Sequence, residues 1–419
     1  MSNFKISCTL FLLLLFLFLS GCTKDSTSVP INKTNNTAAI NTTSTAQILP
    51  ANNSTKDLWF LTFGGSNTDK AWAVDVDDEG VYLADYESVP GPLMDIYLYK
   101  LSKNGTVLWK TRWARQWAEQ AYAVFVSHDR IYVGGTTFNG ALHDSSDALV
   151  IAFDKNGKEL WNFTFDQGYG YEEVDGLVAD TNYIYVSGWT KSKESEDIFV
   201  LALDRSGKEV WKTVWGSNGW DEANGQIVVD GSTVYVAGRY NGSSALAEGD
   251  SFLATFDKNK GSYKWHKTWG KKGFDDGFGM GSDGSDLYVV GLTTTATDGG
   301  QIFLVKYDKN GTEQWSQLWG GKKGESSRVV LADATHVYVV GKTDSYGNGS
   351  NDILLLRYRK DGALEWYKTW GSSKTEQAHG AVLDGDYIYI AGETESYGNG
   401  KQDALLIKAG KDGSMPVSH

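Results

Sequence analysis

One stretch of the 419-residue chain, Ser350-Asn-Asp-Ile-Leu-Leu-Leu-Arg-Tyr-Arg-Lys-Asp-Gly-Ala-Leu-Glu-Trp-Tyr-Lys-Thr-Trp-Gly371, holds two short apolar segments on either side of a polar turn. Segments of this length separated by an Asp-Gly turn are typical of β-hairpins. The first tryptophan of the stretch, Trp366, is the last of a column with steps of 50, 52, 50, 54, 50 and 51 residues. The column comprises Trp59, Trp109, Trp161, Trp211, Trp265, Trp315 and Trp366. Seven copies of one unit therefore follow each other along the chain.

A second column has the same count and lies in short apolar runs such as Val337-Tyr-Val-Val-Gly341. It comprises Tyr82, Tyr132, Tyr185, Tyr235, Tyr288, Tyr338 and Tyr389. Each copy divides into four strand-length segments, and the tyrosine segments are apolar on both faces, as expected for sheets packed between other sheets. The sequence predicts an all-β fold, a seven-bladed β-propeller of four-stranded antiparallel blades. A parallel β-solenoid is the alternative, although its coils are usually shorter.

The ends of the chain indicate how the ring closes. The last copy supplies three segments, 378–384, 387–392 and 403–409, and has no tryptophan strand, whereas an extra tryptophan strand at 58–63 precedes the first full set. We therefore predict that the N-terminal strand completes the last blade in a 3+1 closure, which leaves no unpaired edge. The propeller is expected at 57–413, with a short tail at 414–419.

The first 22 residues are interpreted as a lipoprotein signal peptide. Lys5 precedes an apolar run from Ile6 to Leu19, which is too short to cross a bilayer comfortably and fits a signal-peptide core. The run ends in Leu19-Ser-Gly-Cys22, which resembles a prokaryotic lipobox with Cys22 as the lipidated residue. An uncleaved anchor or an ordinary secretory signal is the alternative.

Residues 23–56 are rich in Thr, Asn, Ser and Ala and nearly lack aromatic residues. Such a composition predicts a disordered tether, with a mean reach of roughly 30 Å for a flexible coil of this length. The protein is therefore expected to be anchored to the membrane by lipid only, and to face the cell exterior or the periplasm.

Composition excludes several classes of function. The formal net charge of −13 leaves no basic surface for phosphates, so no nucleic-acid partner is expected. Cys8 and Cys22 are the only cysteines, which removes disulfides, cysteine-based zinc sites and a cysteine nucleophile from the predicted propeller. The histidines have no ligand spacing and no Ser, His and Asp set stands out, so the sequence does not indicate an enzyme. A monomer without an organic cofactor is expected.

Two resemblances add to this interpretation. The stretch 350–371, preceded by Val337-Tyr-Val-Val-Gly-Lys-Thr343, resembles the SBBP family of bacterial and archaeal β-propeller repeats, and the likeness recurs in all seven copies. It implies a secreted or surface-anchored propeller of undefined biochemical role. Leu203-Asp-Arg-Ser-Gly-Lys-Glu-Val-Trp211 is similar to the tryptophan-docking motif of quinoprotein propellers. The best-known quinoprotein dehydrogenases stack pyrroloquinoline quinone on a vicinal disulfide, which this chain lacks, so that cofactor is not predicted.

In an antiparallel blade, the connections into the first strand and from the second to the third lie on one face, which here carries the long loops. An acidic residue stands two places before each innermost strand, next to that face. The acidic column comprises Asp69, Glu119, Glu172, Asp221, Asp275, Glu325 and Glu376. If the column faces the channel, it predicts a ring able to bind a hard cation such as calcium. Alternatively, each carboxylate caps backbone N–H groups of its own turn.

Aromatic residues are distributed unevenly over the same loops. They occur next to the first four blades and are absent from 64–70, 320–326 and 371–377. We predict a ligand-binding aromatic arc formed by Trp117, Tyr169, Tyr171, Trp189, Trp220 and Phe274. Exposed rings of this kind suit the stacking of sugars or contact with a protein. The alternative is that the rings fold down and fill the channel.

These observations favour a lipid-anchored module that binds an envelope protein or glycan, or serves as a scaffold, through its loop-rich face. A surface polysaccharide hydrolase or lyase that uses two residues of the acidic column is a second hypothesis. A purely structural envelope component is a third. Fold alone does not choose among them.

Overall fold

The computed structural model describes residues 57–89, 93–140, 145–192, 195–242, 249–271, 273–294 and 299–418. The predicted signal peptide at 1–22, with its lipidation residue Cys22, and the predicted tether at 23–56 lie outside the described residues. Within the described residues, no helix has the length and apolar character needed to cross a membrane.

The secondary structure of the described residues consists of β-strands. In chain order they are β1 (Trp59–Phe63), β2 (Asp69–Asp77), β3 (Gly80–Ser88), β4 (Met94–Leu101), β5 (Val107–Trp113), β6 (Glu119–Val126), β7 (Arg130–Phe138), β8 (Ser146–Asp154), β9 (Glu159–Phe165), β10 (Glu172–Ala179), β11 (Tyr183–Lys191), β12 (Glu196–Asp204), β13 (Glu209–Trp215), β14 (Trp220–Glu222), β15 (Val228–Asp230), β16 (Thr233–Gly242), β17 (Asp250–Asp257), β18 (Tyr263–Trp269), β19 (Phe274–Ser282), β20 (Leu287–Thr294), β21 (Gln301–Tyr307), β22 (Glu313–Trp319), β23 (Glu325–Ala332), β24 (His336–Thr343), β25 (Asp352–Arg359), β26 (Leu364–Trp370), β27 (Glu376–Asp384), β28 (Tyr387–Thr394) and β29 (Asp403–Gly410).

The strands form antiparallel sheets of four, which are the blades of the fold. Four sheets follow chain order, as in β2-β3-β4-β5, and a fifth has the order β1-β29-β28-β27. The strands β10 to β18 form one larger sheet, in which a single parallel pair between Glu196 and Trp220 joins β10–β13 to β14–β18. The predicted all-β propeller is therefore confirmed, with about seven blades among the described residues.

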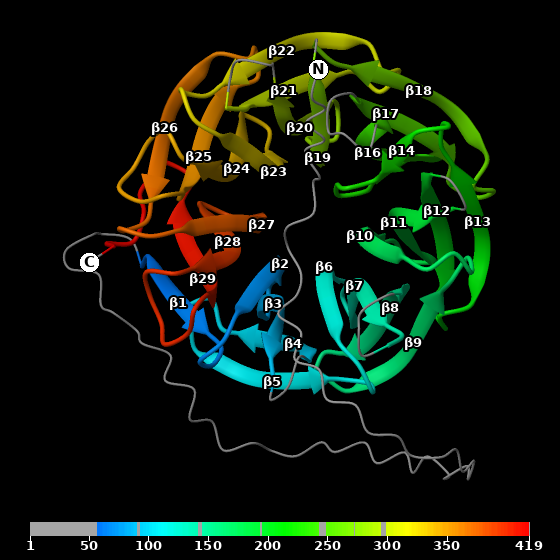
Figure 1. The fold of residues 1–419 in the computed structure, drawn as a ribbon, viewed down its shortest axis with the longest axis horizontal. Coiled ribbons are helices and arrows are strands. Elements are labelled where there is room, and N and C mark those ends of the chain that lie inside the picture. The colour runs from blue at the N-terminus through cyan, green and yellow to red at the C-terminus, as the bar shows by residue number, and fades with distance from the viewer. Residues whose placement is uncertain are drawn as a thin grey trace, which may run out of the picture. The chain divides into compact units, whose positions relative to one another are not determined.

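The blades are arranged in a ring (Figure 1). Strands β2, β6, β10, β19, β23 and β27 lie nearest the axis, and β5, β9, β13, β18, β22 and β26 lie at the rim. Inner strands of adjacent blades contact each other, as β2 does with β6, and β27 contacts β2, so the last sheet meets the first. The inner strands line a central channel, because residues of all six of them line one cavity of about 280 Å³.

The 3+1 closure is confirmed. β1 pairs with β29 in antiparallel register from Trp59–Lys408 to Phe63–Ala404. The C-terminal tail adds to this region, because the carbonyl of Pro416 accepts a hydrogen bond of 3.0 Å from the Trp370 indole. The N-terminal and C-terminal segments of the described chain thus share one sheet.

The tyrosine strands form the buried layer of each blade, as their two-sided apolar pattern predicts. All seven column tyrosines are at most 5% exposed. Several of their hydroxyls donate to an aspartate in the turn before the same strand, as from Tyr185 to Asp180 at 3.1 Å and from Tyr288 to Asp283 at 3.0 Å. The aromatic layer is thereby tied to the hairpin turns.

The column tryptophans join one blade to the next. Each ring packs against a glycine in the turn that follows the third strand of the next blade, as Trp161 does against Gly207 and Trp211 against Gly261. The seven glycines are Gly105, Gly157, Gly207, Gly261, Gly311, Gly362 and Gly413, and all have φ between +69° and +89°. The Trp161 indole also donates to the carbonyl of Arg205 in the same turn at 3.0 Å. Only glycine suits a turn with this φ and a ring in van der Waals contact.

Ion pairs reinforce the same joint. A Lys or Arg from each of these turns pairs with an Asp in the first hairpin turn of the preceding blade. The pairs are Lys103–Asp384, Lys155–Asp77, Arg205–Asp129, Lys258–Asp180, Lys309–Asp230, Lys360–Asp283 and Lys411–Asp333. The series continues across the closure, because Lys103 belongs to the first full blade and Asp384 to the last. We call each tryptophan–glycine contact with its ion pair an inter-blade joint.

The joint can be tested with a matched pair of glycine substitutions. A Cβ on Gly207 (φ +85°) would lie 2.7 Å from the Trp161 ring, whereas one on Gly284 (φ +88°) would meet nothing within 4 Å. Because the backbone strain is nearly equal, Gly207→Ala is expected to lower the free energy of unfolding by about 1–3 kcal/mol more than Gly284→Ala. Chemical denaturation of both variants measures the difference. Equal losses would contradict a tight contact between blades.

Candidate functional site

The channel is lined by side chains that bulges in the inner strands direct towards the axis. Six inner strands contain a β-bulge three residues after the acidic-column residue. Examples are the bulge between Ala71 and Ala73 in β2 and the bulge between Ala378 and Gly380 in β27. In the β14–β18 blade, Asn224 occupies the corresponding place between β14 and β15. Bulges change the direction of a side chain and are common next to functional sites.

The seven residues at these places differ from blade to blade, whereas most of the repeat is conserved between blades. They are Trp72, Tyr122, Asp175, Asn224, Phe278, Arg328 and His379, and all seven line one cavity of about 280 Å³ in the channel. We call them the channel ring. Sequence reasoning missed it, although the signal was present: the third residue after each acidic-column residue is the one neighbouring position where the copies share no residue type.

Part of the channel ring is a packed aromatic cluster. The His379 imidazole stacks on Trp72, with ring centroids 4.2 Å apart and an interplanar angle of 18°, and Tyr122 meets Trp72 edge-on at 5.2 Å. The Arg328 guanidinium lies 5.3 Å from the Trp72 ring centroid and 4.8 Å from that of Phe278. Within the part of the chain that the structure describes, Arg328 has no carboxylate partner. A cation is therefore held between rings and left available to a ligand.

One wall of the channel is acidic. Glu173 and Asp175 on β10 stand beside each other, and burial raises the pKa of Glu173 to about 7 and that of Asp175 well above its ordinary value. Burial also raises the pKa of Asp276 to about 7, although Arg239 nearby acts in the opposite direction. Arg239 pairs with Glu222 and lies 3.7 Å from Asp276. This wall therefore binds protons near neutral pH.

The opposite wall is basic. Lys70 pairs with Glu393 at 2.7 Å, and the His379 Nε2 lies 3.6 Å from the same carboxylate. Burial lowers the pKa of His379, which favours the neutral imidazole, although Glu393 acts in the opposite direction. Burial also lowers the pKa of Lys342, and the nearby charge of Arg328 adds to this effect. Lys70, Arg328, Lys342 and His379 thus gather on β2, β23, β24 and β27.

The acidic column does not form an exposed ring around the channel. Its seven side chains are at most 1% exposed. Each accepts a backbone N–H from the loop before its strand, as Asp69 does from Gly65 at 2.7 Å and Glu325 from Gly321 at 2.8 Å. The other donors are the N–H groups of Arg115, Gln167, Ser217, Lys271 and Ser372, which bind Glu119, Glu172, Asp221, Asp275 and Glu376. This is the turn-capping alternative, since each carboxylate is committed to its own loop.

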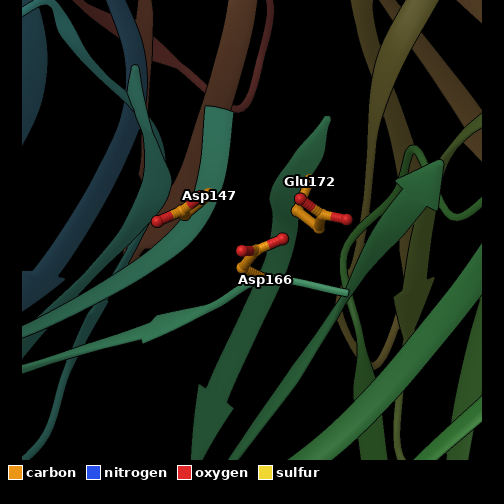
Figure 2. Close-up of side chains that lie close together, drawn as sticks. All are labelled: Asp147, Asp166 and Glu172. Atoms are coloured by element: carbon orange, nitrogen blue, oxygen red, sulfur yellow. The ribbon is translucent and has the colours of Figure 1, made fainter. Parts of the chain in front are cut away.

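The blade containing Glu172 differs from the others, because two more carboxylates lie close to it. One carboxylate oxygen from each of Asp147, Asp166 and Glu172 lies within 4.8 Å of the others, and the Asp166 carboxylate points towards Glu172 (Figure 2). The other blades have Gly or Ala in place of Asp166. Burial raises the pKa of Glu172 to about 7, with contributions from Asp166 and Asp147. The calcium expectation stays a prediction for this acidic cluster.

The residues of the predicted aromatic arc are exposed to different degrees. Tyr169 is 53% exposed, and Trp117, Trp189 and Trp220 are half-buried. Tyr171 is also half-buried and lies beneath the Lys191 ammonium, 5.2 Å from its ring centroid.

Phe274 is a correction to the arc. Its side chain is buried, and the Arg239 guanidinium lies 5.6 Å from its ring centroid, which closes off one side of the ring. None of the predicted arc residues lines either of the two channel cavities. The rings that occupy the channel come instead from the inner strands.

Comparison with known proteins agrees with the fold. The family model for the outer membrane protein assembly factor BamB matches residues 249–414, and no curated protein matches the chain. The WD40 domain of Pan2 from Neurospora crassa is 9% identical, with a TM-score of 0.51 over 83% of this chain and 91% of that chain. This likeness shows a β-propeller fold and no more.

Two further solved structures are similar in outline. The WD40 β-propeller domain of Doa1 is 13% identical, with a TM-score of 0.49 over 82% of this chain and 95% of that chain. The β-propeller domain of the trilobed protease from Pyrococcus furiosus is 11% identical, with a TM-score of 0.48 over 84% of this chain and 98% of that chain.

The acidic wall predicts a pH dependence of stability. Burial raises the pKa of Glu173 in the folded protein from its ordinary value of 4.5 to about 7. Between these two pH values the folded protein binds a proton that the unfolded chain does not. The free energy of unfolding therefore falls as the pH rises from 4.5 to 7. Glu173→Gln, which stays neutral, is expected to have a higher melting temperature than the parent protein at pH 8 and an unchanged one at pH 4.5. Thermal melts across this range give the comparison, and parallel profiles would show that Glu173 ionises normally.

The acidic cluster predicts a response to calcium. Asp166→Asn is expected to raise the melting temperature in a divalent-cation chelator, because one of three mutually repelling charges is lost. Calcium is expected to raise the melting temperature of the parent protein and to affect Asp166→Asn less. Asp78→Asn, at an exposed hairpin turn, is the control. Identical calcium responses in all three proteins would exclude a calcium site at the cluster.

Proposed function

We propose that the protein is a lipid-anchored surface module, a seven-bladed SBBP-type propeller that binds an envelope glycan or protein through its loop-rich face. The observation that carries this proposal is the channel ring. Seven chemically different side chains project from equivalent places of a scaffold whose joints, tyrosines and capping carboxylates repeat. Structural requirements alone would leave these places as similar as the rest of the repeat, and binding of a particular ligand accounts for the difference.

The loop-rich face provides the approach to this ring. The loops before β2, β6 and β10 lead into strands that carry Trp72, Tyr122 and Asp175 within a few residues of the loop. Exposed Tyr169 and half-buried Trp117 occupy loops of the same face, and half-buried Trp220 is the first residue of β14 after another of these loops. A ligand that reaches the channel from this side would contact aromatic residues first and charged groups deeper in.

The predicted lipid at Cys22 and the tether at 23–56 would hold the propeller near the membrane and leave the loop-rich face free to bind. The hydrolase or lyase hypothesis loses its support, because it relied on two acidic-column carboxylates. These side chains are buried and accept hydrogen bonds from their own loops. In that state they do not reach a glycosidic bond.

The binding role is tested by retention of the purified protein on immobilised envelope polysaccharide and on envelope-protein extract. The double variant Trp117→Ala and Trp220→Ala is expected to lose at least tenfold in retention on one of the two resins. Tyr263→Ala removes a 41%-exposed ring from the rim strand β18 and should leave retention unchanged. Full retention of the double variant would reject the aromatic arc, and no retention of the parent protein would favour a purely structural role.

A further inference from the structure

A second cavity of about 260 Å³ lies at the end of the channel nearest the loop-rich face. It is lined near the beginnings of β2, β23 and β27 by Lys70, Ser326 and Gln377, and near the ends of β20 and β24 by Leu292 and Lys342. Both groups of positions adjoin loops of that face. Trp72, Phe278, Arg328 and His379 of the channel ring form its floor, which it shares with the cavity of about 280 Å³ beyond.

The ionisable groups that line this cavity are all basic. They are Lys70, Arg328, Lys342 and His379, and no Asp or Glu is among the lining residues. Glu393, behind the cavity wall, pairs with Lys70 and approaches His379. Among the described residues, neither Arg328 nor Lys342 has a carboxylate within ion-pair distance. A protein of net charge −13 thus keeps two unpaired cations at one point of its channel.

Within the described part of the chain, the floor also holds a polar group without a hydrogen-bond partner, His379, whose Nε2 lies 3.6 Å from the Glu393 carboxylate. The His379 side chain is 7% exposed, and neither of its ring nitrogens has a hydrogen-bond partner among the described residues. A buried donor or acceptor left without a partner costs free energy. Arg328, Lys342 and His379 therefore all gain from an oxyanion that enters the cavity.

The cavity also has uncharged surfaces suited to a sugar. Ser326 and Gln377 offer a hydroxyl and an amide to ligand hydroxyl groups, and Phe278 and Leu292 offer apolar contact. A volume of about 260 Å³ lies just below the ~300–1,000 Å³ of ordinary small-molecule pockets. It therefore suits one sugar-sized unit rather than an extended chain.

We propose that this cavity binds a uronic acid, the terminal unit of an acidic envelope glycan, with its carboxylate between Arg328 and Lys342. The planar guanidinium of Arg328 can bind both carboxylate oxygens, and Lys342 adds a second positive charge. The sugar hydroxyls face Ser326 and Gln377. The inference rests on the proposed function, because it specifies which class of glycan the module recognises.

Calorimetric titration of the purified protein with sodium glucuronate at low salt tests the site, with glucose as the neutral probe of the same ring size. Glucuronate is expected to bind at least tenfold more tightly than glucose and to weaken as salt is added. Arg328→Gln and Lys342→Gln are each expected to weaken glucuronate binding at least tenfold. Arg328→Lys keeps the positive charge but not the planar guanidinium that binds both carboxylate oxygens, so its affinity for glucuronate should lie between those of the parent protein and Arg328→Gln. Arg359→Gln, at the exposed end of β25 where Arg359 pairs with Asp361, is the matched control and should bind as the parent does.

The outcomes separate this inference from the proposed function. Equal binding of glucose and glucuronate, or unchanged binding in a folded Arg328→Gln protein, would overturn it. Inorganic phosphate that binds as tightly as glucuronate would overturn the assignment to a sugar acid. If the protein is retained on envelope polysaccharide but does not bind glucuronate, the inference fails and the proposed function stands. If glucuronate binds but the protein is retained on no envelope material, the proposed function fails and the site stands.

Discussion

The inter-blade joint is the interaction on which the rest of the structure depends. A tryptophan on the rim strand of one blade packs against a positive-φ glycine in a turn of the next blade. A Lys or Arg from that turn forms an ion pair with an Asp of the blade that carries the tryptophan. The joint combines ring contact, a special backbone conformation and an ion pair in a short turn. Because it also spans the closure through Lys103 and Asp384, the ring is held at every boundary, including the one between the last blade and the first.

This joint lies at the rim and on the hairpin side, which leaves the inner strands with few structural duties. The tyrosines bury the middle of each blade, and the acidic column fastens each loop to its own strand. The bulge residue of the inner strand then projects into a channel where no repeated contact constrains it. Residues as different as Trp72, Arg328 and His379 can therefore occupy equivalent places without disturbing the fold.

Because the fold does not constrain which residues project into the channel, charged side chains of both signs occur there. Burial raises the pKa values of Glu173 on β10, Asp276 on β19 and Asp75 on β2, and the cations Lys70, Arg328 and Lys342 lie on β2, β23 and β24. The charge of Arg328 acts to lower the pKa values of Glu173, Asp175 and Asp276, although Arg328 forms no ion pair with any of them within the described residues. The basic wall next to the loop-rich face is the side where a negatively charged ligand gains most, even though the protein as a whole is acidic.

The amino-acid sequence by itself determined the repeat, the four strands of each copy, the 3+1 closure and the face that carries the long loops. Those features depend on residue spacing and on alternation along single strands, which a linear pattern records. The sequence left open whether the acidic-column residues, such as Glu172 and Glu325, face the channel or cap a turn. It also placed Phe274 among the exposed rings. Only the tertiary structure decided these points, since a bulge shifts the alternation of a strand against its partner. The side chain that reaches the axis, such as Arg328, is therefore set by pairing between strands and by packing between blades, which no single strand encodes.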